Sequence, residues 1–261
     1  MADRGRRGAA VSADGQPPTG RVLAARCAEE LAARADATRV EPMQRYMRDQ
    51  FPFLGVMAAG QREAWRAATA GLPRVLPEAV VVDAVTDLWS RRGREHRYLA
   101  CTLANRHAGS PPRAPAATAG FLDTVEALLT DGPWWDTVDS LSTRAVGDLV
   151  RHHPELRPRM VAWLAGDDLW LTRSALLHMN RWRADTDVDW LFSACLARAG
   201  HPDFFIRKAI GWALREYTKV DAAAVVGFVG AHEHELSGLS RREALMWLER
   251  RRRRHRVHGG G

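Results

Sequence analysis

Asp139 stands at a position where the surrounding sequence predicts a small apolar side chain. Four segments in the second half of the chain align without gaps, and they end at Asp139, Ala175, Ala209 and Ala244. A carboxylate that replaces a packing alanine is costly to bury unless it has a partner. Either a function or a local hydrogen-bonded pair must therefore compensate. The function open to a fixed carboxylate is to stabilise positive charge or to orient water.

The four aligned segments recur at the spacing of a helical repeat. They cover residues 134–139, 170–175, 204–209 and 239–244, so the successive intervals are 36, 34 and 35 residues. Such a period suits a two-helix unit that buries its apolar face only by stacking on its neighbours. We therefore predict an all-α fold, an α-solenoid of stacked HEAT-like two-helix repeats that form a curved superhelix. Tetratricopeptide-type repeats have a similar period, so the period alone does not identify the repeat class.

A second aligned column carries Thr137, Arg173, Arg207 and Arg242. Equivalent helices would display these arginines as a row along one edge of the superhelix, where each could bind a DNA phosphate. The alternative is ordinary solvated charge at the turn between paired helices, and the column by itself favours that alternative.

Trp135 and Trp212 are the tryptophans least easily assigned to the core. Trp135 lies one helical turn before Asp139 on the same face, and Trp212 shares a face with Arg215. Most of the other tryptophans sit at helical spacing or in an apolar column and are assigned to packing: Trp65, Trp89, Trp134, Trp163, Trp190 and Trp247.

The composition indicates a soluble, intracellular protein with a polyanionic partner. The chain of 261 residues carries a net charge of +7, and no apolar stretch approaches the about 20 residues of a membrane span. The three cysteines are scattered, so neither disulfides nor a zinc site is expected. His152, His153, His232 and His234 lack convergent carboxylates, and we predict no metal. Phosphate-binding glycine loops and Ser or Cys nucleophile signatures are also missing, which argues against nucleotide hydrolysis and covalent catalysis.

We predict one domain flanked by two tails. Residues 1–20 mix Arg, Gly, Ala, Asp and Pro without an apolar core, which is typical of a disordered tail rather than a secretory signal. Residues 21–250 form the helical-repeat domain. Residues 251–261 form a basic C-terminal tail that either contacts DNA or is merely solvated.

Six stretches between residues 41 and 250 are long or rich in rarely used residue types. They read EPMQRYM from Glu41, FPFLG from Phe51, WWDTVDS from Trp134, LWLTR from Leu169, FFIRKAIGWALREY from Phe204 and LSRREA from Leu239. In this order they resemble the AlkD family of bacterial HEAT-repeat DNA alkylation-repair glycosylases. The resemblance implies a concave face that holds duplex DNA. It also implies hydrolysis of the N-glycosidic bond of cationic N3- or N7-alkylated purines, in base excision repair and without a cofactor.

The same resemblance assigns roles to individual residues. Asp139, Trp135 and Trp212 fall on the family's catalytic positions, and Arg173 falls on a DNA-contacting position. Weaker correspondences give DNA contacts to Tyr46, Arg181 and Arg215, and the arginine column adds Arg207. Arg181 departs from the family pattern, which favours lysine there; the positive charge is kept, but the chemistry specific to lysine is not.

The family is notable for catalysis without base flipping, so the resemblance also implies tolerance of bulky adducts. Self-resistance to a DNA-alkylating natural product is then as open as housekeeping repair. We expect a monomer that acts in the bacterial cytoplasm on the nucleoid. The alternative is a non-catalytic helical-repeat module that binds a nucleic acid or a protein, in which Asp139 is structural.

Overall fold

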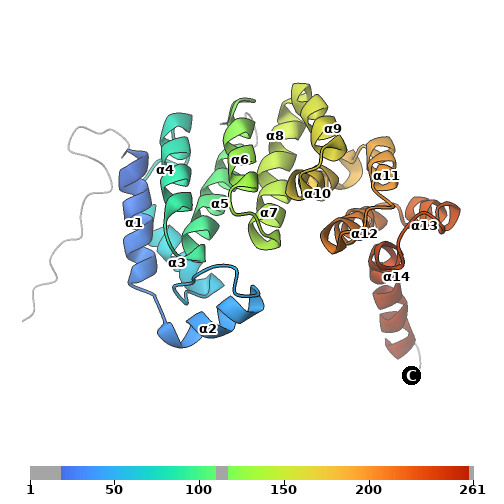
Figure 1. Ribbon diagram of the computed structural model, residues 1–261, viewed down its shortest axis with the longest axis horizontal. Helices are drawn as coiled ribbons and strands as arrows, with labels where there is room; N and C mark the ends of the chain where they lie inside the picture. The colour runs from blue at the N-terminus through green and yellow to red at the C-terminus, as the bar shows by residue number, and fades with distance from the viewer. Residues whose placement is uncertain (1–18, 110–116, 259–261) are drawn as a thin grey trace, which may run out of the picture. The chain divides into compact units, whose positions relative to one another are not determined.

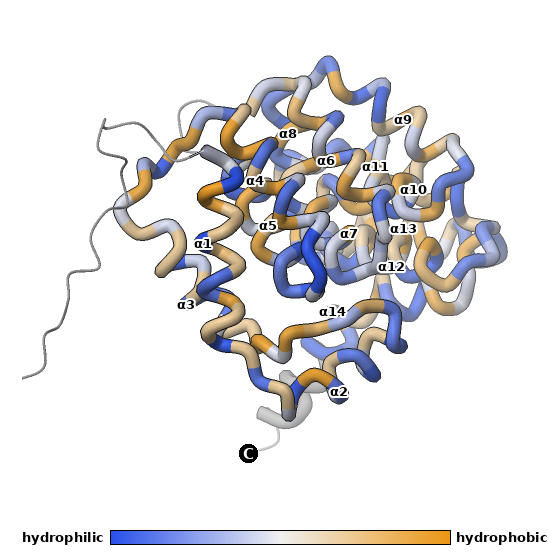
Figure 2. The backbone as a smooth tube through the Cα atoms, turned by 60° about the vertical axis from the view of Figure 1, so that its left-hand side comes forward, coloured by the Kyte–Doolittle hydropathy of each residue, from blue (hydrophilic) through white to orange (hydrophobic). Residues whose placement is uncertain are grey.

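The computed structural model describes residues 19–109 and 117–258, with side chains as far as residue 251. Over these residues the secondary structure is helical and no strand occurs, which confirms the predicted all-α class (Figure 1). Apolar and polar residues alternate in short runs along the helices (Figure 2), as expected for helices that bury one face. The chain divides into two compact units, residues 1–124 and 125–261. The single domain expected over residues 21–250 stays a prediction.

The first unit packs its helices around an aliphatic core. Its helices are α1 (Gly20–Ala32), α2 (Ala37–Tyr46), α3 (Ala58–Ala68), α4 (Glu78–Ser90), α5 (Arg94–Ala108) and the start of α6 (Phe121–Thr130). Helix α4 packs on α5, and α1 packs on α3 and α4. The loop before α3 is fixed by the buried Glu95, whose carboxylate accepts from the backbone N–H groups of Leu54, Gly55 and Val56 at 2.9–3.0 Å. These bonds satisfy loop donors that would otherwise be costly to bury.

The second unit contains the predicted repeat. Its helices after α6 are α7 (Trp135–Leu141), α8 (Gly147–His152), α9 (Arg157–Ala165), α10 (Leu169–Leu177), α11 (Val188–Ala197), α12 (Phe204–Thr218), α13 (Ala222–Ala231) and α14 (Gly238–His258). The aligned segments lie at the starts of α7, α10, α12 and α14, and consecutive members of this series pack on one another. Ala175, Ala209 and Ala244 are all fully buried. The alignment therefore located the packing position of each repeat.

The start of each helix from α10 to α13 is encoded by an aspartate. Asp168, Asp187, Asp203 and Asp221 are the N-cap residues, and each carboxylate accepts from a backbone N–H of the first turn. Such a cap stabilises a helix by about 1 kcal/mol because it satisfies donors that have no partner within the helix. The boundaries of the second unit therefore follow from local sequence.

The predicted tails differ in part from the structure. Thr19 caps α1 and Gly20 begins it, so these two residues do not belong to the N-terminal tail, whose first 18 residues lie outside the described part. At the other end α14 continues through residues 251–258, so this part of the predicted basic tail is helical, and residues 259–261 lie outside the description. Across the described residues, no helix is long and apolar enough to cross a membrane.

Gly211 allows α12 and α14 to approach closely. A Cβ at this position would lie 2.4 Å from Glu243 Cβ and 2.8 Å from Ser240 O, neither of which can move cheaply. We predict that Gly211→Ala lowers the free energy of unfolding by about 2 kcal/mol, because the added methyl group overpacks the contact. Urea denaturation measures this change. The control is Gly227→Ala on α13, where a Cβ meets nothing within 4 Å, and it should stabilise by about 1 kcal/mol through helix propensity. Equal effects of the two substitutions would contradict the steric explanation.

Candidate active site

Asp139 and Arg173 form a two-point ion pair between α7 and α10, which are the equivalent helices of neighbouring repeats. Arg173 Nε donates to Asp139 Oδ1 at 2.7 Å, and Arg173 Nη2 donates to Asp139 Oδ2 at 2.9 Å. This fork geometry is the strong form of an arginine–carboxylate pair. Of the two compensations left open by the sequence, a function or a local pair, the structure shows the pair.

Both partners are largely removed from solvent. The side chain of Asp139 is 19% exposed and that of Arg173 only 4%. Burial raises the pKa of Asp139 above its ordinary value, whereas the hydrogen bonds and the charge of Arg173 act against that rise. Arg173 is therefore the group that favours the ionised carboxylate at this position.

An aromatic cluster packs near the guanidinium of Arg173. Arg173 Nη1 donates to the carbonyl oxygen of Phe205 at 2.5 Å, and its guanidinium lies 5.8 Å from the centroid of the Phe205 ring. The rings of Trp134 and Trp170 pack against Phe205, with centroids 5.4 and 5.0 Å away. Trp134 is thus a packing residue, as predicted. The cluster fixes the guanidinium so that it presents two donors to Asp139.

The arginine column does not form a uniform row of solvated charge. Thr137 and Arg173 are buried, Arg207 is half-buried and Arg242 is exposed. Arg207 Nε donates to the carbonyl oxygen of His201 at 2.8 Å. The interpretation as solvated charge is therefore wrong for Arg173, because its guanidinium is held by Asp139 and Phe205. A phosphate contact of Arg173 stays a prediction.

Trp135 and Trp212 lie on helices that both neighbour α10. Trp135 is the first residue of α7, and Trp212 lies in the middle of α12; both side chains are half-buried. Trp212 Nε1 donates to Glu216 Oε1 at 3.2 Å, which orients the indole. Since α10 contacts both α7 and α12, three neighbouring helices carry Asp139, Arg173 and the two indoles.

The helix that carries Asp139 widens directly after it into a π-helical turn. The segment Ser142–Val146 joins α7 to α8 without a break. Ser142 Oγ donates to Val138 O at 2.6 Å, and Thr143 Oγ1 donates to Asp139 O at 2.8 Å. Hydroxyl groups that bond back to helix carbonyls favour such irregular turns, and π-turns occur often at functional sites.

Gly147 ends the π-turn and lets the chain approach the end of α10. A Cβ there would lie 2.2 Å from the carbonyl oxygen of His178. His178 is buried, with its ring edge-on to Trp182 and Trp190. Its Nδ1 lies 2.7 Å from the carbonyl oxygen of Ala175. A carbonyl only accepts, so Nδ1 carries the hydrogen.

Burial lowers the pKa of His178 to about 4, below its ordinary 6.5. The unfolded chain therefore binds the proton more tightly than the folded chain. The stability contributed by neutral His178 is complete above pH 6.5 and is lost as the pH falls from 6.5 to about 4, by up to about 3 kcal/mol. Urea denaturation across this range should show a shallower pH dependence for His178→Phe than for the unmodified chain. Parallel curves would show that His178 does not titrate on unfolding.

The remaining predicted residues lie in different surroundings. Tyr46 ends α2 in the first unit and is 72% exposed. Arg181 is exposed, and its positive charge, together with burial as the larger cause, lowers the pKa of Arg144 on the π-turn. Arg215 is held by a buried carboxylate, Glu243. No sequence pattern singled out Arg144 or Glu243, because one sits on a turn of unexpected type and the other in a helix contact set by Gly211.

Histidines at helix ends make local contacts. His152 Nδ1 lies 2.8 Å from the carbonyl oxygen of Asp148, and His232 Nδ1 lies 2.7 Å from Glu235 Oε1. Both histidines lie at helix C-termini, as predicted. In the described part of the chain, no group of three or more His, Cys, Asp or Glu residues could hold a metal ion.

Comparison with known proteins finds a family and a solved structure to which the chain is similar. The sequence profile of a family described as "DNA alkylation repair enzyme" matches residues 27–248. A solved structure described as a predicted DNA alkylation repair enzyme from Enterococcus faecalis superposes with a TM-score of 0.73 at 24% identity, over 82% of this chain and 97% of the other. At this identity the likeness shows the fold, a solenoid of helical repeats. The comparison with curated protein sequences returns no match.

Proposed function

The chain belongs to the family of DNA alkylation repair enzymes, and from this we propose that it is a DNA glycosylase. Its reaction is hydrolysis of the N-glycosidic bond of cationic N3- or N7-alkylated purines in duplex DNA. The observation that carries the proposal is the half-buried Asp139 carboxylate, whose two-point pair with Arg173 favours the ionised form, beside two indole-bearing helices. A fixed, ionised carboxylate is suited to a reaction in which positive charge develops on the substrate.

The chemistry takes place at the sugar. Alkylation at N3 or N7 places a positive charge on the purine, so the base leaves with the electron pair of the C1′–N bond and becomes neutral. C1′ and the ring oxygen then acquire oxocarbenium character. Asp139 stabilises this charge and orients a water molecule, whose oxygen bonds to C1′ while its proton passes to the carboxylate.

The pair with Arg173 leaves Asp139 able to stabilise the charge on the sugar and to orient the water molecule. A carboxylate has about four lone-pair sites, and Arg173 occupies one on each oxygen. The others can accept from a water molecule while the fork fixes the plane of the carboxylate. Arg173 is in this view a positioning residue for Asp139, and its guanidinium also opposes protonation of the carboxylate.

The indole faces of Trp135 and Trp212 present negative charge density to the positive deoxyribose. Such contacts contribute about 1 kcal/mol each by analogy with cation–π pairs. Recognition through sugar and backbone needs no pocket for a flipped base, so bulky N3 or N7 adducts are also substrates. We propose that the protein acts as a monomer in the bacterial cytoplasm. Duplex DNA contacts Arg173, Arg181, Arg207 and Arg215 of the second unit, and Tyr46 of the first unit contributes a contact of its own.

The test is release of free modified base from duplex DNA by the purified full-length protein. Duplexes with 7-methylguanine, 3-methyladenine or a bulky N3-adenine adduct are compared with an undamaged duplex. Release of the methylated bases supports general repair, and release of the bulky base alone supports self-resistance. Binding to all duplexes without release of any base would contradict the glycosylase proposal.

One observation favours a second candidate, a non-catalytic DNA-binding module. The fork to Arg173 satisfies Asp139 without any substrate, so the carboxylate has a structural role available to it. In that case DNA affinity, and not base release, would be the activity of the chain. Dependence of base release on Asp139 separates the two candidates.

A further inference from the structure

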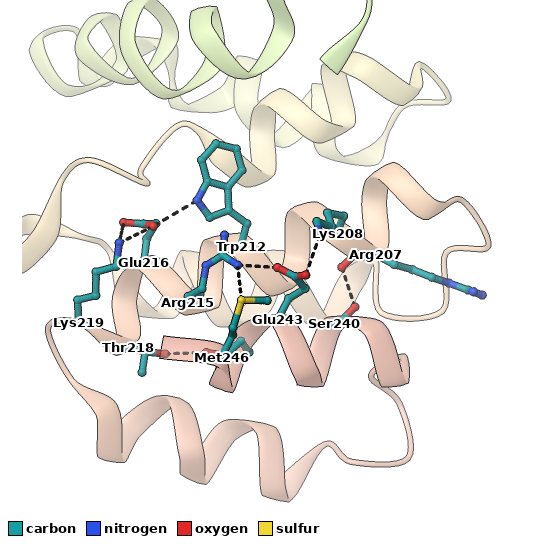
Figure 3. A network of polar contacts seen from close by, with 11 residues as sticks. Arg207, Lys208, Trp212, Arg215, Glu216, Thr218, Lys219, Ser240, Glu243 and Met246 are labelled. Carbon is teal, nitrogen blue, oxygen red and sulfur yellow. Dashed lines mark hydrogen bonds and ion pairs between the residues drawn. The ribbon is translucent and has the colours of Figure 1, made fainter. Parts of the chain in front are cut away.

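A buried carboxylate joins two cations of α12 to α14 (Figure 3). Glu243 on α14 accepts from Lys208 Nζ at 2.7 Å through Oε1 and from Arg215 Nη1 at 2.5 Å through Oε2. The side chain of Glu243 is 7% exposed, whereas those of Lys208 and Arg215 are 39% and 23% exposed. The anion is therefore inside the helix contact, and the two cations extend from it towards the surface.

The two cations lie on one stripe of α12 together with Trp212. Lys208 precedes Trp212 by four residues and Arg215 follows it by three, so all three share a helix face. The backbone positions of Lys208 and Arg215 are about 10 Å apart along the helix axis, but both side chains reach the same carboxylate. In Figure 3 the indole of Trp212 points away from α14, and the two cations turn back towards Glu243. The two positive charges thus meet on the α14 side of α12, and the indole lies on its other side.

Close helix packing makes this arrangement rigid. Gly211 brings the backbones of α12 and α14 together, and Ser240 Oγ donates to Arg207 O at 2.9 Å on the same contact. A free lysine or arginine side chain samples many rotamers, and ordering it on binding costs about 1 kcal/mol. A buried carboxylate that already orders two such side chains removes that cost.

We propose that Glu243 is a positioning residue that holds Lys208 and Arg215 together at the α14 edge of the helix that carries Trp212, where both cations bind phosphates of the DNA backbone. The inference rests on the proposed function, because that function supplies duplex DNA as the ligand. It adds Lys208 to the DNA-contacting residues and gives Glu243 a role beyond joining two helices. Glu243 neutralises one of the two charges, so the group keeps a net positive charge for the phosphates.

The experiment measures the affinity of the full-length protein for an undamaged duplex over a series of salt concentrations. Lys208→Met should lower the slope of log affinity against log salt by about one unit, because one phosphate contact is lost. Arg241→Met is the matched control. This arginine of α14 is 33% exposed and pairs with Glu233 in the loop before the helix. Its loss should leave the slope unchanged.

Glu243→Gln distinguishes positioning from simple charge neutralisation by the sign of its effect. If Glu243 only neutralises, its removal makes the protein more positive, and both affinity and slope rise. If it positions the cations, the slope falls by about one unit although the net charge has risen. Glu233→Gln removes the same charge from an exposed pair and should not lower the slope. Thermal unfolding shows whether each variant is folded.

Two outcomes overturn the inference. An unchanged slope for Lys208→Met shows that Lys208 binds no phosphate, and this variant leaves Glu243 paired with Arg215, so it tests the contact even where Glu243→Gln fails to fold. A raised slope for folded Glu243→Gln shows that Glu243 positions nothing. Neither result depends on base release. A failure of the glycosylase proposal is therefore recognised separately, as binding with a normal salt slope but without catalysis.

Discussion

Replacing Asp139 with asparagine should slow base release from a 7-methylguanine duplex by about a thousandfold at saturating protein. Asparagine has nearly the same shape and can still accept from Arg173, but it carries no negative charge to stabilise the oxocarbenium character of the sugar. Because the lost interaction forms mainly in the transition state, kcat should fall far more than DNA affinity. Single-turnover release of base, with affinity measured in parallel, tests this prediction.

The control for charge is Asp136→Asn, which removes a carboxylate from the same helix three residues earlier. It should retain the activity of the unmodified protein within about threefold, since only Asp139 has the fork to Arg173. Equal losses of activity in the two variants would show that any negative charge on this helix acts in the same way, and that Asp139 has no specific role. If Asp139→Asn loses affinity together with activity, the substitution has damaged the fold, and the assay must be repeated where unfolding curves show a native protein.

Replacing Arg173 with methionine should lower the free energy of unfolding by about 3 kcal/mol, because it leaves the Asp139 carboxylate buried without its partner. The double variant Arg173→Met with Asp139→Asn removes both charges and should recover part of that loss. The non-additivity in urea denaturation measures the coupling between the two side chains. Additive effects would show that the pair contributes nothing as a pair.

The same Arg173 variant should change the pH dependence of base release. Burial raises the pKa of Asp139 and Arg173 opposes that rise, so without Arg173 the pKa moves further upward. The reaction needs the ionised form, and release should be lost as the pH falls through this higher pKa. The acid limb of the pH–rate profile therefore moves to higher pH in Arg173→Met. An acid limb at the same pH in both proteins would assign the titration to another group.

The sequence was sufficient to predict the repeat because its signals are local. Small residues at Ala175, Ala209 and Ala244 mark one packing position in each repeat, and the period follows from counting between them. Asp139 was recognisable as the exception in that column. Its position on α7 and the burial of the equivalent alanines confirm the reasoning.

Other features of the site depend on contacts that no local pattern encodes. The guanidinium of Arg173 is held by the carbonyl oxygen of Phe205, 32 residues later in the chain, so the arginine column alone suggested solvated charge. The π-turn after Asp139 results from competition among backbone and hydroxyl hydrogen bonds, which helix periodicity does not register. The role of Glu243 depends on the approach that Gly211 allows. Each of these requires the three-dimensional neighbours of a residue as well as its place in the repeat.

The fork between Asp139 and Arg173 also restricts how this protein can evolve. Arrays of repeats usually gain or lose a repeat with little penalty, since each repeat contacts only its neighbours. Here one repeat supplies the carboxylate and the next supplies the guanidinium that favours its ionised form, 34 residues away. A repeat inserted between them would separate the side chains of Asp139 and Arg173, and deletion of either repeat would remove one of these side chains. Changes in the number of repeats can therefore accumulate at the ends of the array but not across this junction.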